Sequence, residues 1–241
     1  MRKILAIIFL VLLFSCSDKK TEKIPTSSVD TKDYGDKLIE GTIGDASNLI
    51  PFLASDSASH QVAGLIYNGL VKYDENLSLV GDLAESFKIS PDGLKITFKL
   101  RKGVKWQDGK EFTSDDCVFT YKIITDPNTP TPYSGDFLTV KKVYNPDKYT
   151  FVVEYKEPFA PALASWTVSI VPKHLLDGKD ITKSELARKP VGTGPYILKE
   201  WRRNYRVIFA RNPDWIHGIR KEYYPFSINA SSEDITSGLL A

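Results

Sequence analysis

The sequence is poor in the residues that usually carry metal sites and covalent catalysis. Its 241 residues include two cysteines, three histidines and one methionine. His60, His174 and His217 lie far apart in the sequence, without the short spacings typical of zinc ligands. The Gly-X-Ser-X-Gly turn of serine hydrolases is absent. We therefore expect no metal, no other cofactor and no catalytic residues, and an envelope hydrolase is the least favoured class of function.

Long apolar runs are also scarce, and the longest lies at the start of the chain. Residues 4–14 are uninterrupted apolar residues behind Arg2 and Lys3. Such a run is shorter than the roughly 20 residues that a membrane-spanning helix needs. A positive start followed by a short apolar run is typical of a secretory signal peptide, predicted here over residues 1–15.

The small residue Ser15 before Cys16 resembles a bacterial lipobox, which predicts that Cys16 carries a lipid anchor. The alternative is a plain signal peptide with an incidental cysteine, and Phe14 is an unusual lipobox residue. Residues 16–36 are too polar to form a core and should be a flexible tether. Cys117 then has no disulfide partner, and its place on the apolar face of a predicted helix indicates packing.

Charge of one sign is not in excess. Lys and Arg total 32 and Asp and Glu total 30, for a formal net charge of +2. The basic residues look interspersed with acids along the chain, which gives no electrostatic reason to expect a nucleic-acid partner. The chain is long enough for a sizeable core but short for two full domains.

The segment 94–125 has the clearest pattern of local structure. It predicts a strand over residues 95–100, a turn at Gly103, a short extended piece over 104–106 and a second turn at Asp108-Gly109. A helix should follow, with Thr113 as its cap and Asp116 three residues later. Its expected buried face is formed by Cys117, Val118, Tyr121 and Ile124.

Other segments alternate between strand and helix patterns. Strands are predicted at 37–43, 69–74 and 225–228, with hairpins at 137–144 with 149–155 and at 197–201 with 206–210. Helices are predicted at 58–68, 159–163 and 172–176. The fold class is therefore α/β with a mixed sheet.

Two motifs resemble one known family. Residues 100–122, LRKGVKWQDGKEFTSDDCVFTYK, and residues 190–196, PVGTGPY, are similar to the signatures of family 5 extracellular solute-binding proteins of peptide and nickel ABC importers. The resemblance implies a periplasmic-binding-protein-like fold of the class II, family 5 type. It also implies a lipid-anchored role at the envelope, on the periplasmic or extracellular face of a bacterial membrane, with a small peptide or related solute as ligand and permease subunits as partners.

The same resemblance suggests which residues meet the ligand. It places the polar loop before the first predicted helix at the cleft, and a close approach of backbone at the Gly-rich loop. The candidates are Ser55, Asp56, Ser57, Ser59, Gly192, Thr193 and Gly194. A purely local role remains open for the first four, which can cap the helix. A phosphate-binding loop is dismissed at 192–194, because no Lys-Ser or Lys-Thr pair follows the glycines.

The resemblance covers about the first half of the family architecture. Residues 37–74 and 188–241 are expected to form lobe one, with 75–187 as an inserted subdomain and the second lobe missing. The chain would then be a remnant of a split gene or would pair with a second polypeptide. A surface lipoprotein with an adhesive or scaffolding role is the alternative function. Ligand identity and the choice between inner and outer membrane stay open.

Overall fold

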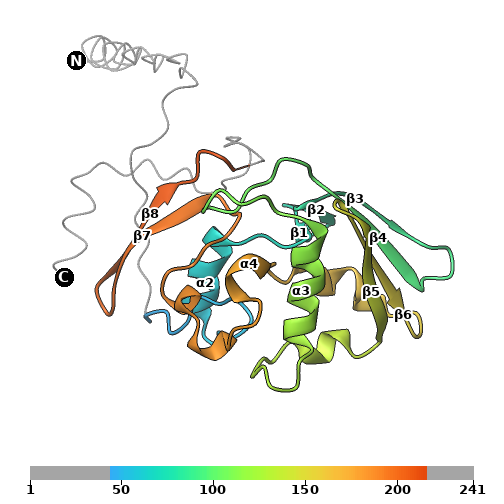
Figure 1. Cartoon of the computed structure of the whole chain (residues 1–241), viewed down its shortest axis with the longest axis horizontal. Coiled ribbons are helices and arrows are strands. Elements are labelled where there is room, and N and C mark those ends of the chain that lie inside the picture. Colours follow the sequence, from blue (N-terminus) through green and yellow to red (C-terminus); the bar gives the residue numbers. More distant parts are fainter. Residues whose placement is uncertain (1–43, 216–241) are drawn as a thin grey trace, which may run out of the picture. The chain divides into compact units, whose positions relative to one another are not determined.

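The computed structural model describes residues 44–215, which all lie in one compact unit, 41–227. Every strand pair among them is antiparallel, in one four-stranded sheet and two two-stranded sheets (Figure 1). The α/β class is confirmed, while no parallel pair of the expected mixed sheet occurs within residues 44–215. The strands predicted at 37–43 and 225–228 lie outside the described residues. No helix of the described part is long and apolar enough to cross a membrane.

The four-stranded sheet has the order β3-β4-β6-β5. Its strands are β3 (Ala84–Ile89), β4 (Lys95–Leu100), β5 (Val140–Asp147) and β6 (Thr150–Tyr155). On β4, Ile96, Phe98 and Leu100 are buried while the residues between them are more exposed. This period of two fits a strand with one face on the core. The strand predicted at 95–100 is confirmed.

The hairpin predicted before Tyr155 is confirmed, with a shifted turn. Asn145, Pro146 and Asp147 were expected in the turn, but they belong to β5, and the turn lies at residues 148–149. Proline cannot donate to a sheet ladder, but β5 is an edge strand. The register also shifts between Tyr144 and Asp147, which accommodates Pro146.

Three α-helices lie in the described residues: α2 (Ser57–Ile66), α3 (Ser114–Ile124) and α4 (Lys173–Leu176). Helix α3 packs against β5, β6 and α4 (Figure 1). Its predicted start is confirmed, because Thr113 and Asp116 form a capping box. The predicted buried face is partly confirmed. Cys117 and Ile124 are buried, whereas Val118 and Tyr121 are half-buried.

Five short 3-10 turns complete the fold: η1 (Ser134–Phe137), η2 (Ala160–Ala162), η3 (Ala164–Thr167), η4 (Ile181–Lys183) and η5 (Glu185–Ala187). The helix predicted at 159–163 is instead η2, which has Pro161 within it. The segment 168–171, which looks extended in sequence, is not part of a strand but is buried at Ile170 and Val171.

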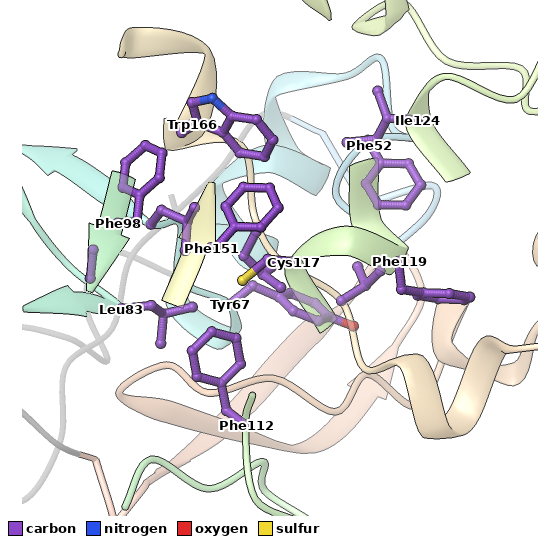
Figure 2. Close-up of a cluster of buried hydrophobic side chains, with 14 of the residues drawn as sticks. Phe52, Tyr67, Leu83, Phe98, Phe112, Cys117, Phe119, Ile124, Phe151 and Trp166 are labelled. Atoms are coloured by element: carbon purple, nitrogen blue, oxygen red, sulfur yellow. The ribbon is translucent and has the colours of Figure 1, made fainter. Parts of the chain in front are cut away.

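The indole of Trp166, in η3, packs against aromatic residues of the four-stranded sheet and of η1. Its ring centroid lies 4.9 Å from that of Phe151, 5.2 Å from Phe137 and 6.0 Å from Phe98. Its Nε1 donates to the Tyr155 hydroxyl at 3.0 Å. The same hydrophobic cluster reaches Phe52, Phe112 and Cys117 (Figure 2). Burial raises the pKa of the Cys117 thiol well above its ordinary value, which agrees with a packing role.

Two hairpins form the remaining sheets. Strands β1 (Val71–Tyr73) and β2 (Leu79–Gly81) form one, and β7 (Tyr196–Arg202) and β8 (Arg206–Arg211) form the other. The β7–β8 hairpin confirms the pattern predicted at 197–201 and 206–210. Strand β7 contacts α2. The hairpin therefore packs against the helix whose first residues belong to the polar segment 55–59.

Candidate functional site

The polar loop predicted at the cleft caps the start of α2. Asp56 is the N-cap, and its Oδ1 accepts from the Ser59 backbone N–H at 2.7 Å. Its Oδ2 accepts from the hydroxyls of Ser47 at 2.6 Å and Ser59 at 2.7 Å. The Ser59 hydroxyl oxygen in turn accepts from the backbone N–H of Ser47. This network ties the chain before α2 to the first turn of the helix.

The Asp56 carboxylate is stabilised by these donors. Partial burial raises its pKa, but the hydrogen bonds from Ser47 and Ser59 outweigh burial and lower the pKa to about 2. Asp56 is therefore ionised at neutral pH, and both of its oxygens are engaged within the protein. Ser59 is fully buried, whereas Ser55 and Ser57 are exposed. The hydroxyls of Ser55 and Ser57 are thus the two in this loop that solvent reaches most readily.

The Gly-rich loop packs against the other end of α2. The Gly194 N–H donates to the Ile66 carbonyl at 2.7 Å. A Cβ on Gly192 would lie 1.9 Å from the same carbonyl oxygen, and one on Gly194 would lie 2.6 Å from it. No side chain fits at these distances, so both glycines are needed for close backbone packing. Within the described residues, the glycines approach Ile66 closely, and an approach of this loop to the ligand cleft stays a prediction.

Thr193 and Asn212 hold the Gly-rich loop in place from both sides. The Thr193 hydroxyl donates to the Asn68 side-chain oxygen at 3.1 Å, and Asn68 donates to the Asp82 carboxylate at 2.9 Å. Asn212 donates to the Gly194 carbonyl at 2.8 Å. Thr193, Asp82 and Asn212 are all buried. Buried side chains with these partners specify one conformation of the loop.

The predicted ligand residues therefore form two groups and not one cluster. Ser55, Asp56, Ser57 and Ser59 lie at the start of α2, and the loop 192–194 lies at its end. Ten helical residues span about 15 Å at 1.5 Å per residue. Their roles toward a ligand remain predictions. Within the described structure, Asp56 and Ser59 act as a cap, and residues 192–194 are buried.

Gln107 joins the two sequence motifs. Its backbone N–H donates to the Gly192 carbonyl at 2.9 Å, and its side-chain Nε2 donates to the Tyr196 carbonyl at 2.8 Å. Its side-chain oxygen accepts from the Gly192 N–H at 3.3 Å. The segments 104–109 and 190–196, far apart in sequence, therefore lie together. Sequence reasoning missed Gln107. A glutamine in a turn is usually exposed to solvent, and no local sequence pattern indicates that its side chain has a partner far along the chain.

The same turn also contacts α4. His174 Nε2 lies 2.6 Å from Asp108 Oδ2, and its ring lies 6.4 Å from that of Trp106. Both contacts of His174 are with the turn at 106–109. Helix α3 is linked to α4 by Asp116, whose Oδ1 accepts from the Lys173 N–H at 3.0 Å. Burial raises the pKa of Asp116, although the hydrogen bonds from Thr113 and Lys173 oppose that shift.

Cys16, the predicted lipidation site, lies outside the described residues. Within residues 44–215, no group of three or more His, Cys, Asp or Glu side chains is arranged to hold a metal ion.

The chain matches a family of known proteins over more than half of its length. Residues 78–232 match the family described as bacterial extracellular solute-binding proteins, family 5 Middle. The oligopeptide-binding protein AppA of Bacillus subtilis is 32% identical over 215 residues, which cover 86% of this chain and 40% of that protein. A putative ABC transporter peptide-binding protein of Brucella ovis is 37% identical over 160 residues, covering 63% of this chain and 30% of that protein.

Solved structures give the same result. AppA of Bacillus subtilis, in complex with a nonapeptide, superposes with a TM-score of 0.69 at 31% identity, over 73% of this chain and 36% of that one. DppA of Helicobacter pylori, in complex with the peptide STSA, gives 0.65 at 32% identity, over 72% and 38%. NikZ of Campylobacter jejuni, in complex with Ni(L-His), gives 0.67 at 30% identity, over 71% and 34%.

The chain thus spans 40% or less of the length of these relatives. The matched region nevertheless includes both sequence motifs and the contacts of Gln107 that join them. On this fold and these matches, the chain belongs to the family 5 bacterial extracellular solute-binding proteins.

Proposed function

We propose that this chain supplies part of a peptide-binding receptor for an ABC importer, held at the bacterial envelope by a lipid on Cys16. One observation carries the proposal: the described fold superposes with a TM-score of 0.69 on a family member that holds a nonapeptide. The role is capture of a ligand and not catalysis. Receptors of this kind bind by closure of two lobes, and a ligand favours the closed state only through contacts made in that state.

The exposed hydroxyls of Ser55 and Ser57 are the proposed ligand contacts. Ser55 follows the buried Ala54, and the two serines flank Asp56. The hydrogen bonds of Asp56 fix the backbone of this loop. A fixed loop with free hydroxyls can pair with the main chain of an extended peptide at little cost in conformational entropy. The remaining contacts, including those of a second lobe, would come from further residues or from a second polypeptide.

Peptide titration of the receptor isolated from its host envelope tests this function. Tryptophan emission should change saturably with mixed oligopeptides. The pair Ser55→Ala with Ser57→Ala should weaken binding by about tenfold or more, because each lost hydrogen bond contributes about 1 kcal/mol. Ser78→Ala with Ser86→Ala, also at exposed positions, is the matched control. Absence of any peptide binding would overturn the function, whereas an unchanged affinity of the first pair would overturn only the loop contact.

Mass spectrometry of the same envelope protein tests the anchor. We expect a mature chain that starts at a diacylated Cys16, and Cys16→Ser should release the protein from membranes in the presence of an intact signal peptide. An unmodified Cys16, or a chain cleaved elsewhere, would overturn the lipid anchor and leave the peptide-binding proposal in place.

A further inference from the structure

Positive charge is concentrated in one short part of the chain. Residues 188–211 contain a single acidic residue, Glu200, and seven basic ones: Arg188, Lys189, Lys199, Arg202, Arg203, Arg206 and Arg211. All seven are exposed. Because the whole chain has a net charge of only +2, the rest of it carries more acidic than basic residues. The expectation of interspersed charge therefore fails in this region.

Few carboxylates neutralise these cations. Glu200 pairs with Arg202 and with Arg206, the latter at 3.2 Å. Asp45 lies 3.8 Å from Arg203, and Glu185 lies 3.7 Å from Lys189. Among the residues that the structure describes, three carboxylates thus serve the six cations of residues 188–206, and most of the pairs are solvent-exposed and weak. An excess of positive charge remains on the β7–β8 hairpin and the segment before it.

The cations surround a hollow. Arg188, Lys189, Lys199 and Arg203 line a depression of about 620 Å³ together with Leu198 and Trp201. The Arg188 guanidinium stacks on the Trp201 indole at 4.2 Å. Stacking holds that guanidinium in place with its donors available at the edges. Such a surface suits phosphate groups, which arginine binds with two donors at once.

The tip of the hairpin adds an aromatic residue to this basic surface. Tyr205 is 73% exposed, and Arg206 lies 5.4 Å from its ring centroid. Tyrosine is favoured at membrane interfaces, where its ring sits at the level of the headgroups. The turn that carries it is held rigidly, because Asp45 accepts from Trp201 Nε1 and from the Asn204 N–H, both at 3.0 Å.

We propose that this basic surface, residues 188–206, docks onto anionic phospholipid headgroups of the membrane to which the receptor is attached. The proposal rests on the anchor of the proposed function. The flexible tether predicted over residues 16–36 would have an average span of about 25 Å, which would keep the fold close to the bilayer. Electrostatic attraction between the basic residues and anionic headgroups acts over about 8 Å at physiological ionic strength. Docking would give the tethered fold one fixed orientation relative to the membrane. The family is extracellular, which favours lipid over nucleic acid as the anionic surface.

A fluorescent label on the hairpin tip reports docking directly. The full chain with Cys16→Ser and Tyr205→Cys takes a single label, because Cys117 is buried. When the labelled chain is mixed with vesicles of phosphatidylglycerol and phosphatidylcholine, the emission of the label should shift to shorter wavelength, and the shift should be lost with pure phosphatidylcholine and at high salt. A label at Leu138→Cys, another exposed position, should not shift.

Charge variants give the matched comparison. The shift should be abolished in the triple variant Lys189→Gln, Lys199→Gln and Arg203→Gln. Each basic residue near an anionic surface changes the affinity of the protein for that surface about fivefold. The control removes the same amount of charge at exposed positions elsewhere in the chain, with Lys110→Gln, Lys141→Gln and Lys179→Gln. This control should keep the emission shift. Equal shifts on both lipids, or equal losses in both triple variants, would overturn the proposal.

The same label distinguishes lipid from an acidic protein as the partner of the basic surface. A shift caused by soluble polyglutamate but not by anionic vesicles would mean that the surface binds an acidic protein, and lipid docking would be wrong. Because the labelled chain has no lipid on residue 16 and needs no peptide, failure of the peptide-binding function leaves this result readable.

Discussion

At the scale of single residues, the two ends of α2 show how little freedom the predicted site residues have. At Gly192, a Cβ would clash with the Ile66 carbonyl oxygen. At Asp56, both carboxylate oxygens already accept hydrogen bonds from the protein. Gly64, in the last turn of the same helix, has no atom within 4 Å of the position that a Cβ would take. The same residue type is therefore obligatory at one position and replaceable at another.

Gly192→Ala should destabilise the fold by about 3 kcal/mol, because the new methyl group forces backbone against backbone. Gly64→Ala should instead stabilise it by up to about 1 kcal/mol, since glycine in a helix interior is unfavourable. Urea unfolding of both variants measures the difference. A Gly192→Ala variant as stable as the parent would show that the loop can move away from Ile66.

Asp56 predicts a dependence of stability on pH. Its pKa is about 2 in the folded protein, below the ordinary value of 3.8, so the folded state favours the ionised form. This contribution is fully present above about pH 5 and is lost as the pH falls towards 2. Asp56→Ala should therefore lower the unfolding free energy by about 1 to 2 kcal/mol at pH 7, as for other caps, and by little at pH 2.

Unfolding of the Asp56→Ala variant across this pH range checks the expectation. Ser55→Ala, at the neighbouring exposed position, serves as the control and should follow the parent at every pH. A difference between Asp56→Ala and the parent that stays constant from pH 7 to pH 2 would contradict the role of the ionised cap.

At the scale of elements, the local signals in the sequence located most helices and strands of the described part. Strand β4, helix α3 and the β7–β8 hairpin were predictable because alternation, capping and turn residues are local properties. The end of β5 was not, since whether Pro146 is tolerated depends on β5 being an edge strand. The contacts of Gln107 were equally hidden, because their partners lie in a segment far along the chain.

Asp116 connects helices α3 and α4 and is the element-scale test. Asp116→Ala removes the acceptor for the partly buried backbone N–H groups of Thr113 and Lys173, which should cost about 2 to 3 kcal/mol. Asp116→Asn retains an acceptor oxygen and should cost less. Asp115→Ala, at the exposed position before it, should change stability by less than about 1 kcal/mol. Equal effects of the two alanine variants in denaturant unfolding would show that Asp116 does not link the helices.

At the scale of the whole molecule, one hydrophobic cluster runs through the described fold. It includes Ile66 and Leu70 from the predicted lobe one, and Phe98, Phe151 and Trp166 from the predicted inserted subdomain. The division into lobe and subdomain remains a prediction from family resemblance. What sequence patterns could not provide is how tightly the two parts share their core, because packing depends on all of the elements at once.

A shared core predicts a single unfolding transition. Trp166→Phe, in the middle of the aromatic cluster, and Gly192→Ala, in the Gly-rich loop, should both lower the midpoint of the same transition. Near-ultraviolet and far-ultraviolet circular dichroism should report coincident curves for the full chain. Two separate transitions, each shifted by only one of the variants, would show that residues 75–187 fold independently.

The contact between Ile66 and Gly194 has a consequence for biosynthesis. The carbonyl at the end of α2 finds its partner 128 residues later in the chain. At about 5 to 20 residues per second, a ribosome adds that partner roughly 6 to 26 seconds after Ile66. We therefore expect the nascent chain to leave the ribosomal tunnel before the end of α2 has this partner, which would lengthen the time available for the secretion predicted from residues 1–15 to begin on an unfolded chain.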